Sequence, residues 1–325
     1  MQQAKLRASN QLSFQDSLLH KQVNDLTFVA FDTETTGRHP IISGLLEVSA
    51  IKFNAKGQVL ESRTQLINPG RSIPEDVTLI HGITDEMVAD APSVKEVIPP
   101  FVDWMKAKPS AFTDESDMNV FIAHNASFDV NFLQVALTRL GMPLPANPVI
   151  DTLKMARHFV NDSRNHRLKT LVEYFKLDEL EGYHRAEVDS RHVMRVFLSM
   201  LANLDPQLTL AELVDACGLM FFSKPFEEIQ EHGNSGDLRV QTIGEAMQLS
   251  SDLYIHYRGP GIKFRQITPL SVLYSAKRYY LNAYCHAAKS ERTFRVDRIA
   301  SLELLDGKTS SLRLEDCKPE LRGRG

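Results

Sequence analysis

The sequence has few cysteines and no long apolar run. Its 325 residues include only three cysteines, Cys217, Cys285 and Cys317, which lie far apart with no C-x-x-C spacing. Neither a disulfide framework nor a cysteine zinc site is therefore indicated, and we expect reduced thiols. No stretch approaches the roughly 18 apolar residues that span a bilayer, and the polar N-terminus lacks the apolar core of a secretory signal. We expect no membrane association and a cytoplasmic location.

A strong overall charge is also absent. The 37 basic and 41 acidic side chains give a net charge of −4, so the whole chain lacks the excess of positive charge typical of nucleic-acid-binding proteins. The charge is unevenly distributed, however. Residues 1–205 carry 21 basic and 26 acidic side chains, a net charge of −5, whereas residues 258–298 carry nine basic and two acidic ones, a net charge of +7. The second stretch is expected to meet an anionic partner.

The order of apolar runs predicts an α/β domain followed by a smaller β domain. Residues 25–205 begin with three β-type runs and continue with helices alternating with short strands, which predicts a mixed sheet covered by helices. The expected strands are 26–32, 46–54, 59–67, 120–123 and 149–150, and the expected helices are 94–105, 129–140, 152–159, 168–175 and 189–204.

A second strand-rich region is expected to begin near Leu238. Short β-type runs at 254–257, 264–267, 279–285 and 293–299 have a spacing typical of a small barrel or sandwich. The predicted organisation is an N-terminal extension at 1–24, the α/β domain at 25–205, a helical connector at 206–237, the β domain at 238–306 and a polar tail at 307–325.

Two acidic side chains stand at the end of the first buried strand. The alternation of side chains along a strand places Asp32 and Glu34 on one face, roughly 6.6 Å apart. Buried acids cost free energy unless something positive compensates them. The bland alternative is that Thr33, Thr35 and the residues after them form a solvated turn.

Two further aspartates lie in line with the apolar stripes of predicted helices. Asp129 and Asp189 each occupy a first turn and point inward, although the helix dipole alone also favours an acid there. Together with the strand pair they make four inward carboxylates. Hard divalent cations with oxygen ligands are their natural compensation, and zinc is the weaker choice because no cysteine or second histidine lies nearby.

Three ordered motifs resemble those of the DEDD exonuclease superfamily. They are FDTETTG at 31–37, HNASFD at 124–129 and HRAEVD at 184–189. The last has His five residues before Asp, as in the histidine (DEDDh) subclass, whereas Tyr183 has the wrong spacing for the tyrosine subclass. The segments IHGIT at 80–84 and VIDTL at 149–153 are similar to the branch with the bacterial polymerase proofreading (epsilon) subunit. The resemblance covers about residues 25–205 and implies an RNase H-like fold.

This resemblance implies a 3′→5′ exonuclease that releases nucleoside monophosphates from single-stranded DNA or RNA 3′ ends, with DNA favoured. Two Mg²⁺ or Mn²⁺ ions would be held by Asp32, Glu34, Asp129 and Asp189. A pair of ions stabilises both the attacking and the leaving oxygen in a phosphodiester displacement. His184 would act as the general base, a role suited to a side chain whose ordinary pKa is about 6.5.

Other residues beside the motifs are weaker candidates. Thr35, Asn125 and Phe128 would line the site of the 3′-terminal nucleotide, and His81 would shape the substrate loop, with Thr84 capping a short turn. Asp151 follows a strand and precedes a helix, so an N-cap role is favoured over metal ligation.

The second region resembles a WYL domain, over about residues 238–306. The resemblance rests on RQITPL at 265–270, YYLNAY at 279–284 and RTFRVDRI at 292–299, with Tyr279 in place of the usual Trp. It implies a small Sm/SH3-like β-barrel that binds single strands or senses a nucleotide. The candidate contacts are Arg265, Tyr280, Arg292 and Arg298. Strand alternation would place Arg292, Phe294, Val296 and Arg298 on one face, where the two arginines could bracket a phosphate.

Two alternatives remain open at this point. The basic stretch is also compatible with an ordinary solvated barrel whose aromatic residues form its core. The whole chain is also compatible with a catalytically silent regulator that binds nucleic acid through a nuclease-like fold. The intact set of four acids and His184 argues against the second alternative, and the residues do not distinguish DNA from RNA.

Overall fold

A computed structural model describes residues 17–108, 118–177, 184–229, 236–258 and 264–305. Two compact units divide the chain, Met1–Lys224 and Pro225–Gly325. Among the described residues, no helix combines the length and the apolar character needed to cross a bilayer. Cys217 and Cys285 are free and buried, and Cys317 lies outside the described residues.

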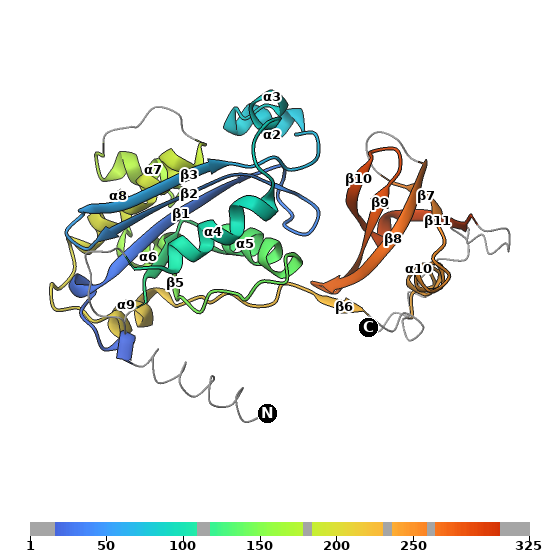
Figure 1. Ribbon diagram of the computed structural model, residues 1–325. Coiled ribbons are helices and arrows are strands. Elements are labelled where there is room, and N and C mark those ends of the chain that lie inside the picture. The colour runs from blue at the N-terminus through green and yellow to red at the C-terminus, as the bar shows by residue number, and fades with distance from the viewer. Residues whose placement is uncertain (1–16, 109–117, 178–183, 230–235, 259–263, 306–325) are drawn as a thin grey trace. The chain divides into compact units, whose positions relative to one another are not determined.

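The first unit contains a five-stranded mixed sheet, as predicted. Its strands are β1 (Thr27–Thr35), β2 (Leu45–Asn54), β3 (Val59–Leu66), β4 (Val120–Ala123) and β5 (Val149–Asp151), in the order β3-β2-β1-β4-β5. The first three strands pair antiparallel, whereas β4 runs parallel to β1 and to β5 (Figure 1). Because β1 and β4 are buried on both faces, their sequences read as continuous apolar runs.

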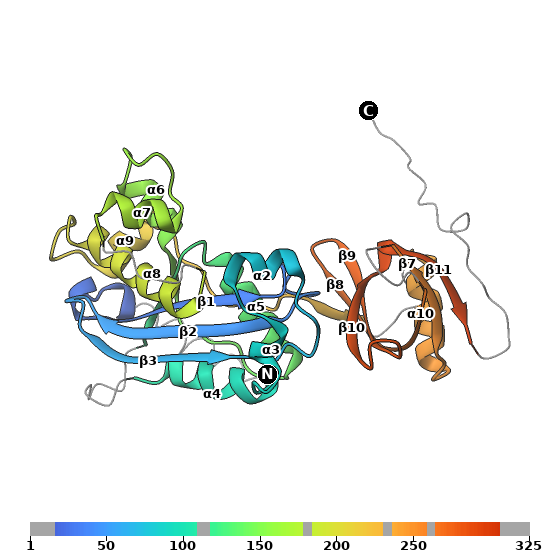
Figure 2. The same cartoon turned by 90° about the horizontal axis from the view of Figure 1, so that it is seen from above.

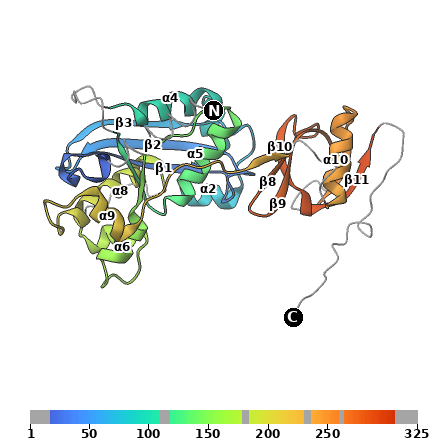
Figure 3. The same cartoon turned by 90° about the horizontal axis from the view of Figure 1, so that it is seen from below.

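Helices cover both faces of this sheet. They are α2 (Glu75–His81), α3 (Asp85–Val88), α4 (Val94–Lys106), α5 (Ser127–Arg139), α6 (Thr152–Phe159), α7 (Leu168–Tyr174), α8 (Ala186–Leu201) and α9 (Leu210–Cys217), with a short 3-10 turn η1 (Val23–Asp25) before β1. Helices α6, α7, α8 and α9 lie on one side of the sheet and α4 on the other (Figures 2 and 3). Each face therefore has its own apolar core.

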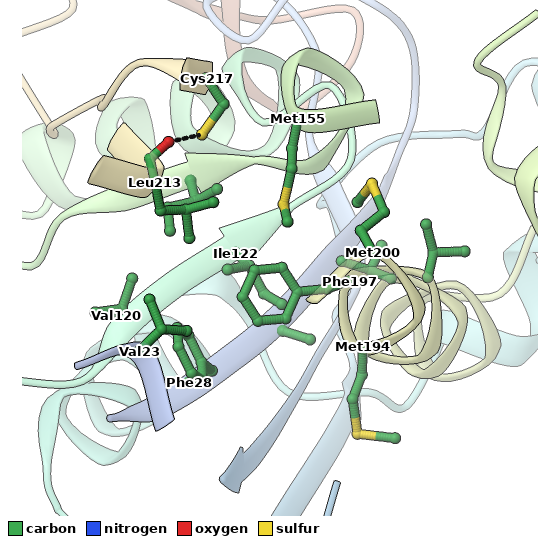
Figure 4. Close-up of a cluster of buried hydrophobic side chains, with 14 of the residues drawn as sticks. Val23, Phe28, Val120, Ile122, Met155, Met194, Phe197, Met200, Leu213 and Cys217 are labelled. Carbon is green, nitrogen blue, oxygen red and sulfur yellow. Dashed lines mark hydrogen bonds between the residues drawn. The ribbon is translucent and has the colours of Figure 1, made fainter. Parts of the chain in front are cut away.

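The core beneath α8 fixes this helix against β1. Phe28 of β1 packs against Phe197 of α8, with ring centroids 4.8 Å apart, and Phe53 of β2 completes the cluster at 5.7 Å from Phe28. All three side chains are fully buried, which stabilises the fold by about 1.5–3 kcal/mol each. Helix α9 joins the same core, where the Cys217 thiol donates a hydrogen bond to the Leu213 carbonyl (Figure 4). The N-terminal turn of α8 is thereby held next to the end of β1.

The described residues of the second unit form an antiparallel sheet and a helix. Its elements are β6 (Glu227–Ile229), α10 (Leu238–Gln248), β7 (Leu253–Tyr257), β8 (Phe264–Ser275), β9 (Arg278–Cys285), β10 (Ser290–Arg295), the 3-10 turn η3 (Val296–Arg298) and β11 (Ile299–Leu304). The strand order is β10-β9-β8-β7-β11, with β6 paired to β8. The described pairings do not join β10 to β11, so closure into an Sm/SH3-like barrel stays a prediction.

The second unit has a helix, α10, ahead of β7, which Asp237 caps by accepting a hydrogen bond from the Arg239 amide at 3.0 Å. One sequence-based expectation for this unit was wrong. The run 293–299 is not one strand, because Arg295 pairs with Asp297 at 2.6 Å within the turn η3 that follows β10. Arg298 therefore does not lie on the same strand as Arg292, and the prediction that both share one strand face was wrong. The predicted segment boundaries stay predictions.

Candidate active site

Three of the four predicted carboxylates meet at one end of the first sheet. Asp32 and Glu34 extend from β1, and Asp189 extends from the first turn of α8. One carboxylate oxygen from each side chain lies within 4.8 Å of the others. Strand alternation and the packing of α8 on β1 together create this cluster, which we call the carboxylate cluster.

Asp129 lies beside this cluster on another helix. It occupies the first turn of α5 and is only 2% exposed. Its Oδ1 accepts hydrogen bonds from the backbone N–H and the hydroxyl of Thr33, at 2.9 and 2.8 Å. Thr33 lies between Asp32 and Glu34 on β1, and the charge of Asp129 raises the pKa of Asp32. The fourth predicted acid thus adjoins the other three.

Burial is the main electrostatic feature of these four acids. It raises the pKa of Glu34 to about 8, of Asp129 to about 7 and of Asp189 to about 6, and it raises the pKa of Asp32 well above its ordinary range. For Asp32 and Glu34, repulsion by neighbouring carboxylates adds to the effect of burial. Such groups are costly to ionise without a positive partner.

The residues fit a hard divalent cation. Besides the crowded carboxylates, Asp189 has a buried Oδ1 with no hydrogen-bond partner among the described residues. Oxygen ligands of this kind are those that Mg²⁺ and Mn²⁺ prefer. Of the two described cysteines, Cys217 lies in an apolar core and Cys285 lies in the second unit, so a thiolate zinc site is not formed there.

His184 lies two residues before the start of α8 and is exposed to solvent. Its charge lowers the pKa of Asp189, which places the imidazole next to the carboxylate cluster. The backbone at His184 has a φ of 63°, in the left-handed region that non-glycine residues rarely adopt. The surrounding structure must therefore hold this conformation.

An ion pair between a half-buried arginine and a buried glutamate, which sequence reasoning missed, holds that segment. Arg185 donates two hydrogen bonds to the Glu47 carboxylate, at 3.1 Å from Nε and 2.5 Å from Nη2, and the Ala186 amide donates a third at 2.8 Å. Glu47 is 1% exposed on β2 and lies opposite Glu34 in the strand register. The sequence offered one signal for this pair, the charged Glu47 within the buried run 45–53. Its partner Arg185 lies 138 residues away, so no local pattern connects them.

The predicted substrate-loop residue His81 is buried beside the site. It is 4% exposed, and its Nδ1 accepts a hydrogen bond from the Ile83 amide at 3.0 Å. Its Nε2 is buried without a hydrogen-bond partner in the described part of the chain. Burial lowers the pKa of His81, and the Thr35 backbone and the charge of Glu47 partly oppose this shift. Thr84 caps α3, as predicted, by accepting a hydrogen bond from the Met87 amide.

The other predicted residues lie at the end of β1 and around the start of α5. Thr35 ends β1, and its hydroxyl donates to the Gly37 carbonyl at 2.8 Å. Phe128 packs on Phe132 at the beginning of α5, with ring centroids 5.0 Å apart. Asn125 has a φ of 59°, and its amide donates to Asp151 Oδ1 at 2.9 Å. The same oxygen caps α6, which confirms the N-cap role predicted for Asp151.

In the second unit, two of the predicted arginines are neighbours. Arg265 on β8 and Arg292 on β10 flank Cys285 of β9, and Arg265 Nη1 lies 3.7 Å from the Cys285 sulfur. Burial lowers the pKa of Arg292, and the charge of Arg265 lowers it further. Tyr280 is buried on β9, and Arg298 is exposed on η3. The structure therefore associates Arg292 with Arg265 and not with Arg298.

Comparisons with known proteins identify both regions. A family model described as an exonuclease matches residues 29–197, and a WYL domain model matches residues 239–304. The PolC-type DNA polymerase III of Caldanaerobacter subterraneus subsp. tengcongensis is 36% identical over 177 residues, which cover 54% of this chain and 12% of the relative. The Bacillus subtilis PolC-type DNA polymerase III is 36% identical over 183 residues, which cover 56% of this chain and 12% of the relative. The chain thus matches only about an eighth of the length of these relatives.

A solved structure of exonuclease X in complex with 5′-overhanging duplex DNA is also similar. It is 26% identical in sequence, has a TM-score of 0.43 and covers 59% of this chain and 99% of that chain.

Proposed function

The chain belongs to the exonuclease family that matches residues 29–197, and we propose that it is a metal-dependent 3′→5′ exonuclease acting on single-stranded nucleic acid. Its first unit has the RNase H-like exonuclease fold, a mixed sheet flanked by helices. The observation that carries the proposal is the carboxylate cluster, in which acids with raised pKa values crowd beside an exposed histidine. DNA is the favoured substrate over RNA, and nucleoside monophosphates are the proposed products.

The carboxylate cluster and Asp129 would hold the divalent ions. Bound there, Mg²⁺ or Mn²⁺ ions supply electrostatic stabilisation of the charge that develops on a phosphodiester under in-line attack. His184 takes the proton from the attacking water, because its imidazole is exposed to solvent and adjoins Asp189. The Glu47–Arg185 pair orients His184 by clamping the residue that follows it.

His81 offers a contact for the terminal nucleotide. Its buried Nε2 has no hydrogen-bond partner in the described part of the chain, and burial lowers its pKa, which favours the neutral ring. A neutral imidazole can donate or accept a hydrogen bond to a sugar or phosphate oxygen. Thr35, Asn125 and Phe128 would line the same region.

The second unit would bind nucleic acid or a nucleotide through phosphate contacts. Arg265 and Arg292 support this proposal, because two neighbouring guanidinium groups concentrate positive charge that suits phosphate oxygens. A barrel closed in the Sm/SH3-like manner is part of the same proposal. The rival function is a silent regulator that binds nucleic acid without cutting it.

Digestion of 5′-labelled substrates separates these two functions. Single-stranded DNA, duplex DNA and RNA are incubated with Mg²⁺, with Mn²⁺ or with a chelator. The exonuclease shortens the single strand stepwise from its 3′ end, and only with metal. Binding of the strand with no hydrolysis in either metal would support the regulator and contradict the proposed enzyme.

A further inference from the structure

A basic pocket lies next to the second exonuclease motif. It has a volume of about 550 Å³ and lies in the first unit. Two leucines and six polar residues form its walls, and none of the eight is acidic. The polar residues are His124, Asn125, Arg157, Asn165, His166 and Arg167.

Hydrogen bonds fix the walls of this pocket. Nδ1 of His124 bonds to the Thr152 hydroxyl at 3.0 Å, which ties the motif to the start of α6. Nε2 of His166 donates to the Val160 carbonyl at 2.7 Å and so closes the loop between α6 and α7. The pocket is therefore preformed, as binding sites usually are.

Arg157 and Arg167 supply the positive charge of the pocket. Both side chains are exposed, and neither forms an ion pair with an acid within the described residues. By contrast, Arg164 in the same loop pairs with Glu173 at 2.5 Å and does not line the pocket. His124 adds no charge near neutral pH, because burial lowers its pKa to about 4 despite the opposing charge of Asp151.

One chain segment links the pocket to the candidate active site. Asn125 forms part of its wall, and four residues later Asp129 adjoins the carboxylate cluster. Asp151 joins the two regions, because it caps α6 and also accepts the Asn125 amide. A strand bound at the cluster would thus meet the pocket beside it.

We propose that this pocket is a second phosphate subsite, which binds a phosphodiester of the substrate strand other than the one being cut. The inference rests on the proposed exonuclease function. Guanidinium groups recognise phosphate oxygens, and the two arginines of the wall supply this kind of donor. The subsite therefore recognises the backbone and not the sequence. It retains the strand while the terminal nucleotide is removed.

The test uses the full chain with Arg157→Gln and Arg167→Gln combined, and Arg164→Gln as the matched control. Binding of a long 5′-labelled single strand is followed by fluorescence anisotropy in a chelator over a range of salt concentrations. Each arginine that neutralises a single-strand phosphate contributes about −0.7 to the slope of log affinity against log salt. The double variant should therefore flatten the slope by about 1.4, and Arg164→Gln should leave it unchanged.

Hydrolysis assays give the second part of the test. The double variant should show a raised KM on the long strand, with unchanged hydrolysis of the p-nitrophenyl ester of thymidine 5′-monophosphate, which reaches only the carboxylate cluster. A wild-type salt slope in the double variant would overturn the proposal. So would an equal loss on the ester, or weakened binding of free thymidine 5′-monophosphate without weakened strand binding. If the wild type hydrolyses neither substrate, the exonuclease function fails while the anisotropy result still decides the subsite.

Discussion

The two units of the chain each gather charges of one sign, but the signs are opposite. In the first unit, Asp32, Glu34 and Asp189 converge where β1 ends and α8 begins. In the second, Arg265 and Arg292 stand on either side of Cys285 on neighbouring strands. Like charges held together cost free energy in the unliganded protein. We therefore propose a cation site in the first unit and an anion site in the second.

The two clusters also differ in how firmly the fold holds them. The carboxylates extend from elements packed on a core that includes Phe28 and Phe197, so their geometry is set by buried residues. Arg265 and Arg292 are long, partly exposed side chains at the sheet surface. We therefore expect substitutions in the first unit to act on turnover and those in the second to act on affinity. The predictions below test this division.

The largest expected effect is that of His184→Ala. Loss of a general base should slow hydrolysis by roughly 10²–10⁴-fold at neutral pH. Metal affinity should stay almost unchanged, because His184 is not one of the proposed ligands. Single-turnover rates measure the first quantity, and Mn²⁺ titration by calorimetry measures the second. A large loss of Mn²⁺ affinity would show that the imidazole is a ligand.

Single substitution of each acid, Asp32→Ala, Glu34→Ala, Asp129→Ala or Asp189→Ala, should lower turnover by at least about 10²-fold. This is the scale seen when one preorganised electrostatic group is lost. The proteins should still fold, since each change removes one of several acids that repel one another. The exposed Glu75→Ala is the matched control. Near-normal activity in any purified variant would remove that residue from the set of ligands.

Arg185→Gln should lower kcat less than His184→Ala does, and with little change in KM. The variant loses the clamp that orients His184, but the base itself is retained. Arg185→Lys should restore only part of the activity, because an ammonium cannot reproduce the two parallel hydrogen bonds of the guanidinium. Full activity in Arg185→Gln would contradict a positioning role for the pair.

The metal-free protein should lose stability as the pH rises. A carboxyl whose pKa is raised in the folded state contributes stability that is present below its unfolded pKa and is lost as the pH rises through the folded value. For Glu34 this window runs from 4.5 to about 8. Thermal unfolding in a chelator should show a falling Tm across that range, and Glu34→Gln should flatten the fall. A Tm independent of pH there would contradict the raised pKa.

The smallest effect is expected in the second unit. Combining Arg265→Gln with Arg292→Gln should flatten the salt slope for a long single strand by about 1.4 if both contact phosphate. Arg298→Gln, on the exposed turn η3, is the comparison for a basic residue outside the pair. Turnover of a short ester substrate should not change. An unaltered slope in the double variant would mean that this charge serves another partner.

The sequence predicted the five strands of the first sheet and the four acids of the candidate active site, because both leave local patterns. The continuous apolar run before Asp32 and the helical stripe in line with Asp189 each follow from the geometry of one element. The mixed sheet and the caps by Asp151 and Thr84 were confirmed for the same reason.

The features that the sequence did not predict depend on contacts between distant segments, or on a local turn that replaces a strand. Glu47 and Arg185 are brought together by the packing of α8 on β2, and neither position carries a motif of its own. The turn η3 interrupts a β-type run because Arg295 pairs with Asp297 two residues on. Arg157 and Arg167 form one pocket only after the loop between α6 and α7 has folded.

Titration of Mn²⁺ into the full chain near neutral pH, by calorimetry in buffers of different ionisation enthalpy, tests the central claim most directly. Binding at acids with raised pKa values must release protons, because a metal and a proton compete for the same oxygens. The account predicts saturable binding with proton release, and loss of both in the Asp32→Ala/Asp189→Ala variant. Absence of saturable binding, or wild-type binding in that variant, would contradict it.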